Sequence, residues 1–244
     1  MQLQFVGCGD AFGSGGRFNT CFHVKGARAN FLIDCGASSL IALKRYNIVR
    51  DDIDVILITH FHGDHFAGLP FLMLDAQFSR RTRPLIIAGP EGVELRLTQA
   101  MEALYENSSK TKQKFELSVV TLRPEESKDL GALKVTPFPV VHGESGGPFL
   151  AYRIETEGRT ITYSADTEWT ETLVPAAQGA DLFICEAYSY DRAVKNHLSL
   201  KTLEEHLPRI APKKLVLTHM SDDMLARLDT LPYTAASDGM VVEL

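Results

Sequence analysis

Four apolar, strand-like segments of this chain each lead into a histidine, an aspartate or a glutamate. They are Leu133–Val141 before His142, Thr160–Tyr163 before Ser164-Ala165-Asp166, Leu182–Cys185 before Glu186, and Lys214–Thr218 before His219. Functional groups on an α/β scaffold gather where strands end, so we expect one edge of a core sheet to bring these side chains to a common site. The pattern predicts a layered α/β protein rather than an array of repeats.

A denser cluster follows the apolar run Val55–Ile58, with the sequence Thr59-His60-Phe61-His62-Gly63-Asp64-His65. Neutral imidazole and carboxylate are the usual protein ligands of zinc and similar divalent metals. The alternation of His60 and His62 allows both rings to face one space. Asp64 and His65 are adjacent and cannot both serve that same point from a regular strand, which indicates a second metal or a catalytic carboxylate.

Hydrophobic periodicity predicts the remaining elements. We expect strands at Cys21–Val24, Phe31–Asp34, Leu85–Ala88 and Phe115–Val120, and a hairpin of 149–154 with 160–163 through Glu157-Gly158. Helices are expected at Ser38–Tyr46, at Phe66–Leu74 with an interruption near Pro70, at Glu91–Glu106, and near Leu173, Leu200–Leu207 and Met224–Leu228. In Glu91–Glu106 the predicted apolar side carries Val93, Leu97, Met101 and Leu104. Leu133–Val141 contains Pro137 and Pro139 and reads as an edge strand that leads to a loop.

Composition limits the setting in which the protein works. The 244 residues are 45% hydrophobic and 23% charged, with no run near the roughly 20 apolar residues that cross a bilayer. The segment Met1–Val6 lacks a basic flank, so we expect a cytoplasmic protein without a membrane partner. Cys8, Cys21, Cys35 and Cys185 form no C-x-x-C pair and are expected to be reduced, buried thiols. The formal charge of −6 disfavours general attraction to a polyanion.

Two polar segments have less specific signatures. The glycine-rich stretch Gly7–Gly16 lacks the Lys-Ser/Thr ending of a P-loop, and both substrate contact and a tight connection remain open for it. Arg17 and Asn19 are the polar groups there best able to reach a ligand. Lys110–Lys114 is expected to be a solvated loop. We expect His23 and His206 to be structural.

The histidine and aspartate pattern resembles the metallo-β-lactamase superfamily over essentially the whole chain. The matching residues are Thr59 to His65, His142 after a strand, Asp166 in Ser-Ala-Asp-Thr and His219 in Leu-Thr-His. The resemblance implies one domain over residues 1–244 with a four-layer αβ/βα sandwich, in which two central mixed sheets are flanked by helices. It also implies two divalent metal ions. His60, His62 and His142 would hold one ion, Asp64, His65 and His219 the other, and Asp166 would bridge both.

Details within the superfamily resemble ribonuclease Z and its phosphodiesterase relatives. Asp166 stands where classical zinc β-lactamases place a cysteine. The segments Ile184-Cys185-Glu186-Ala187 and Asn196-His197-Leu198-Ser199 resemble the Glu-Ala and histidine segments of that branch. The resemblance therefore implies a hydrogen-bonded Glu186–His197 pair that assists catalysis together with Asp64. The tRNA-gripping glycine-rich and basic arm of ribonuclease Z has no counterpart between Leu74 and Leu133, and Gly13–Asn19 replaces its proline-and-basic loop near the N-terminus.

These observations predict a binuclear metal-dependent hydrolase, with a phosphodiesterase favoured. Zinc is the expected metal, with manganese or iron as alternatives. A small phosphodiester or another small molecule is the expected substrate, RNA is the less favoured one, and a homodimer is expected by resemblance. The first alternative is hydrolysis of a lactone, thioester or amide at the same site, since fold alone does not decide the reaction. The second, from another class, is an iron-binding redox protein or a non-catalytic metal protein.

Overall fold

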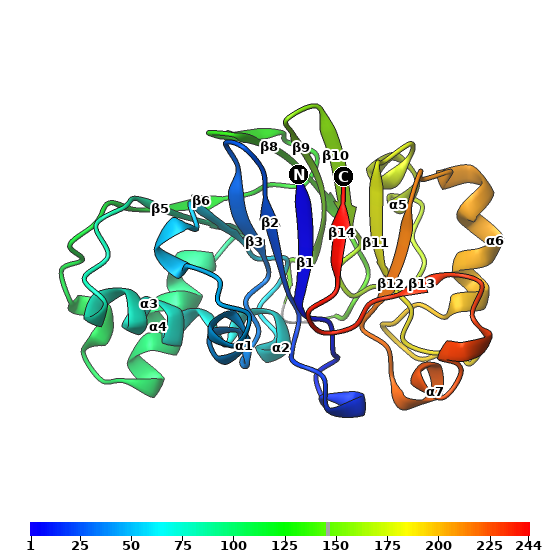
Figure 1. Cartoon of the computed structure of the whole chain (residues 1–244), viewed down its shortest axis with the longest axis horizontal. Helices are drawn as coiled ribbons and strands as arrows, with labels where there is room; N and C mark the ends of the chain where they lie inside the picture. The colour runs from blue at the N-terminus through cyan, green and yellow to red at the C-terminus, as the bar shows by residue number, and fades with distance from the viewer. Residues whose placement is uncertain (145–146) are drawn as a thin grey trace.

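The computed structural model describes residues 1–144 and 147–244 of the chain. Within them, two sheets of seven strands lie face to face, as predicted (Figure 1). The first sheet has the order β14 (Val241–Glu243), β1 (Gln2–Gly7), β2 (Cys21–Lys25), β3 (Asn30–Ile33), β4 (Val55–Leu57), β5 (Leu85–Gly89) and β6 (Leu117–Thr121). The second has the order β13 (Thr234–Ala235), β12 (Leu215–Thr218), β11 (Leu182–Glu186), β10 (Arg159–Tyr163), β9 (Leu150–Thr156), β8 (Leu133–Pro139) and β7 (Lys128–Leu130).

The helices form the two outer layers (Figure 1). On the first sheet lie α1 (Ser39–Arg45), α2 (Gly63–Phe66), α3 (Leu69–Phe78) and α4 (Val93–Leu104). On the second lie α5 (Leu173–Ala177), α6 (Leu200–Ile210) and α7 (Asp222–Leu225). Four single 3₁₀ turns are described at Ser14–Gly16, Arg50–Asp52, Ser108–Lys110 and Leu228–Thr230.

Alternation of side chains along the strands explains why both faces of each sheet are buried. In β3, Phe31 and Ile33 join the core between the sheets, whereas Leu32 packs under the helices. In β11, Leu182 and Ile184 face the inner core and Phe183 packs against α6. Strands that are covered on both faces carry continuous apolar runs, as these do.

Strand direction determines which strand ends meet. From β7 to β10 the neighbours are antiparallel, and from β10 through β11 and β12 to β13 they are parallel. The first sheet repeats this pattern, because β3, β4, β5 and β6 are parallel. Parallel strands end at the same edge of a sheet, so the loops after β3 and β4 and those after β10, β11 and β12 open toward one region. The predicted gathering of strand ends is therefore confirmed.

Several local predictions need correction. Pro70 lies in the first turn of α3 and does not interrupt a helix, because proline lacks the N–H that an initial turn leaves unbonded anyway. Leu104 is 49% exposed and does not share the buried side of α4 with Val93, Leu97 and Met101. β8 is the second strand from the edge, although its pairing with β7 ends at Val135, before the two prolines. The C-terminal β14, which pairs with β1, was not expected.

The predicted hairpin, the buried thiols and the exposed lysine segment are confirmed by the structure. The hairpin of β9 and β10 turns at Glu157-Gly158, and all four cysteines are free and buried. Lys110, Lys112 and Lys114 are exposed. In the described part of the chain, no helix has the length and apolar character to cross a membrane. The predicted loop after His142 includes residues 145 and 146, which lie outside the described residues.

Candidate metal centre

Three histidines from two sheets form the first cluster of the site. His60 and His62 follow β4, and His142 follows β8. His142 Nε2 lies 3.0 Å from His62 Nδ1, and the His60 ring centroid lies 4.6 Å from that of His62 and 5.1 Å from that of His142. One nitrogen of each ring lies within 4.8 Å of the others, which is the spacing of ligands around one ion.

Two aspartates and two histidines form the second cluster. Asp64 and His65 lie in α2, Asp166 follows β10, and His219 follows β12. His219 Nε2 lies 3.1 Å from Asp64 Oδ2, and His65 Nε2 lies 3.2 Å from the same oxygen. The adjacent residues Asp64 and His65 thus reach a common point from one turn of helix rather than from a strand.

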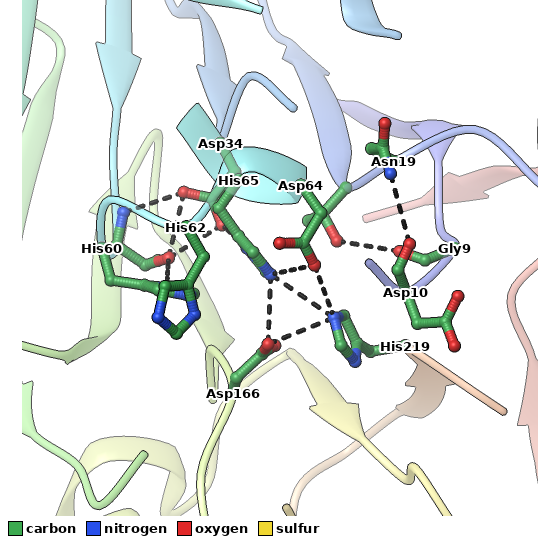
Figure 2. Close-up of polar contacts among 12 residues, drawn as sticks. Gly9, Asp10, Asn19, Asp34, His60, His62, Asp64, His65, Asp166 and His219 are labelled. Atoms are coloured by element: carbon green, nitrogen blue, oxygen red, sulfur yellow. Dashed lines mark hydrogen bonds and ion pairs between the residues drawn. The ribbon is translucent and has the colours of Figure 1, made fainter. Parts of the chain in front are cut away.

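Asp166 belongs to the second cluster and also lies close to the first (Figure 2). Its Oδ2 is 3.1 Å from His219 Nε2 and 3.2 Å from His65 Nε2, and it is 3.6 Å from His142 Nε2 in the first cluster. A single carboxylate oxygen is therefore within reach of both groups. The structure brings together all seven residues that sequence reasoning named as metal ligands.

Backbone conformation helps to aim these side chains. Asp34, Ala165 and His219 adopt left-handed φ values of 60°, 54° and 56°, each just after a strand of the site. Non-glycine residues rarely take this conformation, which costs of order 1 kcal/mol and is concentrated at functional sites. The turns redirect the chain immediately after β3, β10 and β12.

The electrostatics differ between the two clusters. Burial, together with the neighbouring imidazoles, holds the pKa of His60 well below its usual value. Burial also lowers the pKa values of His62 and His142. These three rings are therefore neutral near pH 7 and keep a nitrogen lone pair available, which a metal ligand requires.

In the second cluster the carboxylates dominate. Burial opposes the charge on His65, but Asp166, Asp64 and Asp34 raise its pKa well above the usual value. His219 is buried as well, and Asp166 and Asp64 raise its pKa to about 9. The nearby histidines in turn lower the pKa values of Asp64 and Asp166 despite their burial. The second cluster thus concentrates carboxylate charge, which protons on its histidines or bound cations must balance.

The donor set fits two divalent cations. The first cluster offers three imidazole nitrogens with an Asp166 oxygen nearby, and the second offers imidazole nitrogens and carboxylate oxygens. Both sets suit zinc, manganese or iron. His60 Nε2 and Asp166 Oδ1 are buried and have no hydrogen-bond partner among the described residues. Buried polar atoms are normally bonded, so two unbonded atoms in this site fit the ligand atoms of a cation.

Further residues orient the predicted ligands. Asp34 Oδ2 lies 2.7 Å from His65 Nδ1, and Oδ1 of Asp34 accepts a 2.8 Å bond from the backbone N–H of Thr59. The Asn196 carbonyl oxygen lies 2.7 Å from His142 Nδ1. Such partners fix the tautomer and orientation of a ligating histidine. Sequence reasoning did not assign Asp34 to the site, although it follows a buried strand in the same manner as the predicted ligands.

Glu186 and His197 are in hydrogen-bonding contact, as the resemblance to ribonuclease Z implied for this pair. Glu186 Oε2 lies 3.1 Å from His197 Nδ1, and its other oxygen accepts a bond from the Thr167 N–H. The Tyr188 ring stacks on His197 with centroids 4.4 Å apart. Burial raises the pKa of Glu186; burial lowers that of His197, but the Glu186 carboxylate more than offsets this and raises it.

A hollow of about 230 Å³ opens onto the two clusters. Its walls include His62, Asp64, His142, Asp166, His197 and His219, together with Phe12 and Tyr188. A second hollow of about 460 Å³ shares His62 and is otherwise lined by Phe61, Ala67 and residues of α2, α3 and α4, among them Arg96. A reacting group in the first hollow would contact both clusters and His197.

The other polar residues singled out in the sequence bond to the protein itself. Arg17 donates a 2.7 Å bond to the Ala236 carbonyl, and the amide nitrogen of Asn19 donates to the carbonyl of Asp10. His23 contacts Asn30 at 2.6 Å, and His206 stacks on Trp169 at 3.7 Å, which agrees with the structural roles predicted for both histidines. Arg17 and Asn19 therefore shape the loop rather than line the hollow.

Two facing mixed sheets with helices outside, and a histidine and aspartate site at their common edge, define the metallo-β-lactamase superfamily. The family model described as anti-Pycsar protein Apyc1 matches residues 1–232. The chain belongs to that family.

Comparisons with individual proteins agree with this assignment. Ribonuclease Z of Agathobacter rectalis is 29% identical, and the match covers 88% of this chain and 86% of that relative. The crystal structure of the short form of human tRNase Z has a TM-score of 0.81 at 26% identity and covers 100% of this chain and 99% of its own. The metallo-β-lactamase fold protein YhfI of Bacillus subtilis has a TM-score of 0.78 at 20% identity, with 99% of each chain covered. The predicted similarity to the ribonuclease Z branch is confirmed.

Proposed function

We propose that the protein is a binuclear metal-dependent phosphodiesterase. The observation that carries this proposal is the position of Asp166, whose Oδ2 lies within 3.6 Å of a histidine of the first cluster and nearer still to two of the second. The ribonuclease Z relative and the human tRNase Z neighbour support hydrolysis of a phosphodiester.

In the proposed site, His60, His62 and His142 would hold one cation, Asp64, His65 and His219 would hold the other, and Asp166 would lie within reach of both. Zinc is favoured, with manganese and iron as the alternatives, because mixed nitrogen and oxygen ligands suit all three. A pair of such cations supplies Lewis-acid activation of water and neutralises charge on the phosphoryl oxygens.

The side chains around the hollow contribute the remaining chemistry. Asp64 orients the attacking water by accepting its hydrogen bond. His197 donates a proton from Nε2 to the departing alkoxide, because Nδ1 is already bonded to Glu186. Glu186 fixes the ring and favours its protonated form, so we assign it a positioning role.

A small phosphodiester is the proposed substrate class. The hollow over the clusters has a volume of about 230 Å³, and the net charge of −6 disfavours a polyanion. The region between Leu74 and Leu133, in which the sequence has no counterpart of a tRNA-gripping arm, is built mainly from α3, β5, α4, β6 and β7. The names of the relatives favour RNA instead, which makes RNA the second candidate substrate.

The domain organisation, the oligomeric state and the compartment are also part of the proposal. We propose that residues 1–244 form one hydrolase domain that assembles as a homodimer, as the resemblance implies. Four free, buried cysteines support a reducing compartment, for which we propose the cytoplasm.

A substrate panel tests the proposed function. Protein with quantified metal content is assayed with bis(p-nitrophenyl) phosphate, a precursor tRNA, a lactone and a thioester. We expect turnover of the phosphodiester that disappears on chelation and returns with added zinc or manganese. Preferential cleavage of the lactone or thioester would overturn the proposal, and preferential processing of the tRNA would replace the small substrate with RNA.

A further inference from the structure

Phe12 combines two properties that oppose each other, since its side chain is 83% exposed and yet it lines the hollow above the metal centre. Single exposed apolar residues are common on protein surfaces, so exposure alone indicates nothing. Its place in the wall of the hollow is the second observation. A substituent of a substrate bound at the clusters would leave the hollow past this ring.

The loop that carries Phe12 is held by a buried carboxylate. Asp10 is fully buried, and its Oδ1 accepts bonds from the backbone N–H of Phe12 at 3.2 Å and of Ser14 at 2.9 Å. Its Oδ2 accepts a 2.7 Å bond from the Ser14 hydroxyl. Gly13 completes the turn with φ +67°, a conformation that glycine adopts without strain. The ring is therefore presented by a bonded turn.

The same loop is tied to the site. The carbonyl oxygen of Cys8 accepts a 3.2 Å bond from the backbone N–H of His219, one of the predicted ligands. Asn19 lies between this loop and β2, and its side-chain amide donates a bond to the carbonyl of Asp10 (Figure 2). These bonds fix the distance between Phe12 and the second cluster, which a binding surface requires.

We propose that Phe12 is a stacking platform for a planar aromatic group, such as a nucleobase, carried by the phosphodiester substrate. The inference rests on the proposed function, because it places the phosphoryl group at the clusters. Bases stack on aromatic side chains without regard to sequence, and alanine substitution of such platforms weakens binding by roughly tenfold or more. Phe12 would thus select nucleotide diesters over aliphatic ones.

Two substrates with the same leaving group test the proposal. One is the p-nitrophenyl ester of thymidine 5′-monophosphate, and the other is methyl p-nitrophenyl phosphate, which has no ring on the retained arm. We expect Phe12→Ala to lower the ratio of kcat/KM for the nucleotide ester over the methyl ester by about tenfold, mainly through KM. Phe12→Trp should preserve the ratio, and Phe12→Leu should fall between them.

Phe78→Ala is the matched control, because Phe78 is 81% exposed at the end of α3 and lies outside the hollow. It should leave the ratio unchanged. An unchanged ratio in Phe12→Ala overturns the inference, as does a changed sedimentation coefficient in that variant, which would place Phe12 in an interface between two copies. If the wild type hydrolyses neither ester, the proposed function fails, and calorimetric binding of thymidine 5′-monophosphate still decides the role of Phe12 by the same comparison of variants.

Discussion

His65 Nδ1 lies 2.7 Å from Asp34 Oδ2, and both side chains are fully buried. A carboxylate in this position orients a ligating histidine and increases its basicity, and loss of such a partner typically costs 10 to 100-fold in metal affinity. We therefore expect Asp34→Asn, which keeps the volume and removes the charge, to weaken binding of one cation by about that factor. Zinc competition with a chromophoric chelator measures it.

Asp54→Asn is the control for this change. Asp54 lies just before β4 and pairs at 3.0 Å with Arg83 on the surface. Exposed ion pairs contribute little to stability. Unchanged zinc affinity in Asp34→Asn, or an equal loss in Asp54→Asn, would contradict the orienting role of Asp34.

Removal of His65 should affect metal content before it affects the fold. We expect His65→Ala to bind about one cation instead of two and to lose turnover even with excess metal. The circular dichroism spectrum should change little, because the core of the two sheets and their helices is built by other residues. Elemental analysis after dialysis gives the stoichiometry. His206→Ala should keep two cations, since His206 stacks on Trp169 away from the clusters; activity of metal-replete His65→Ala would refute the two-metal assignment.

The Glu186–His197 pair predicts a pH effect. If protonated His197 is the acid, activity is present below its pKa and is lost as pH rises through it. Because the Glu186 carboxylate raises that pKa, Glu186→Gln should lower it and move the alkaline limb of kcat/KM to lower pH. His197→Gln should remove the limb and reduce kcat.

A series of leaving groups distinguishes the loss of proton donation by His197 from a structural defect. With p-nitrophenolate, which departs without a proton, His197→Gln should lose much less activity than with an alkyl leaving group. Glu204→Gln, at an exposed pair with Lys201, should leave the pH profile unchanged. An equal loss for both leaving groups would exclude an acid role for His197.

Two buried tyrosines make a matched test of stability. The Tyr152 hydroxyl donates a 2.6 Å bond to the Ile58 carbonyl, whereas the Tyr163 hydroxyl has no partner among the described residues. Tyr152→Phe leaves a buried carbonyl unbonded and should lower the free energy of unfolding by about 1 to 2 kcal/mol. Tyr163→Phe removes an unbonded hydroxyl and should leave it unchanged or raise it. Urea titration compares the two, and an equal loss in both would contradict the bonding difference.

Much of this architecture could be predicted because strand ends and periodicity are local signals. His142, Asp166, Glu186 and His219 each stand after an apolar run, and that position places them at one edge of the sheets. The sequence could not show which ring nitrogen faces which oxygen, because those distances depend on how the two sheets pack.

What was missed lacked a distinct local signal. Asp34 reads as the last residue of an ordinary strand until the parallel pairing of β3 with β4 brings it beside Thr59 and His65. Leu104 fits the helical period of α4, but it is the last residue of that helix. The packed surface that buries Val93, Leu97 and Met101 does not reach it, so Leu104 is exposed. β14 is three residues long and gains its place through pairing with β1, far away in the chain.

The two sheets divide the site between the halves of the chain, since His60 to His65 come from the first half and Asp166 and His219 from the second. During synthesis, the first half therefore leaves the ribosome with an incomplete set of ligands. Ions bound by residues of both halves would link the two sheets, so loss of metal should weaken the contact between the sheets. Halves expressed separately should each fail to bind two metal ions.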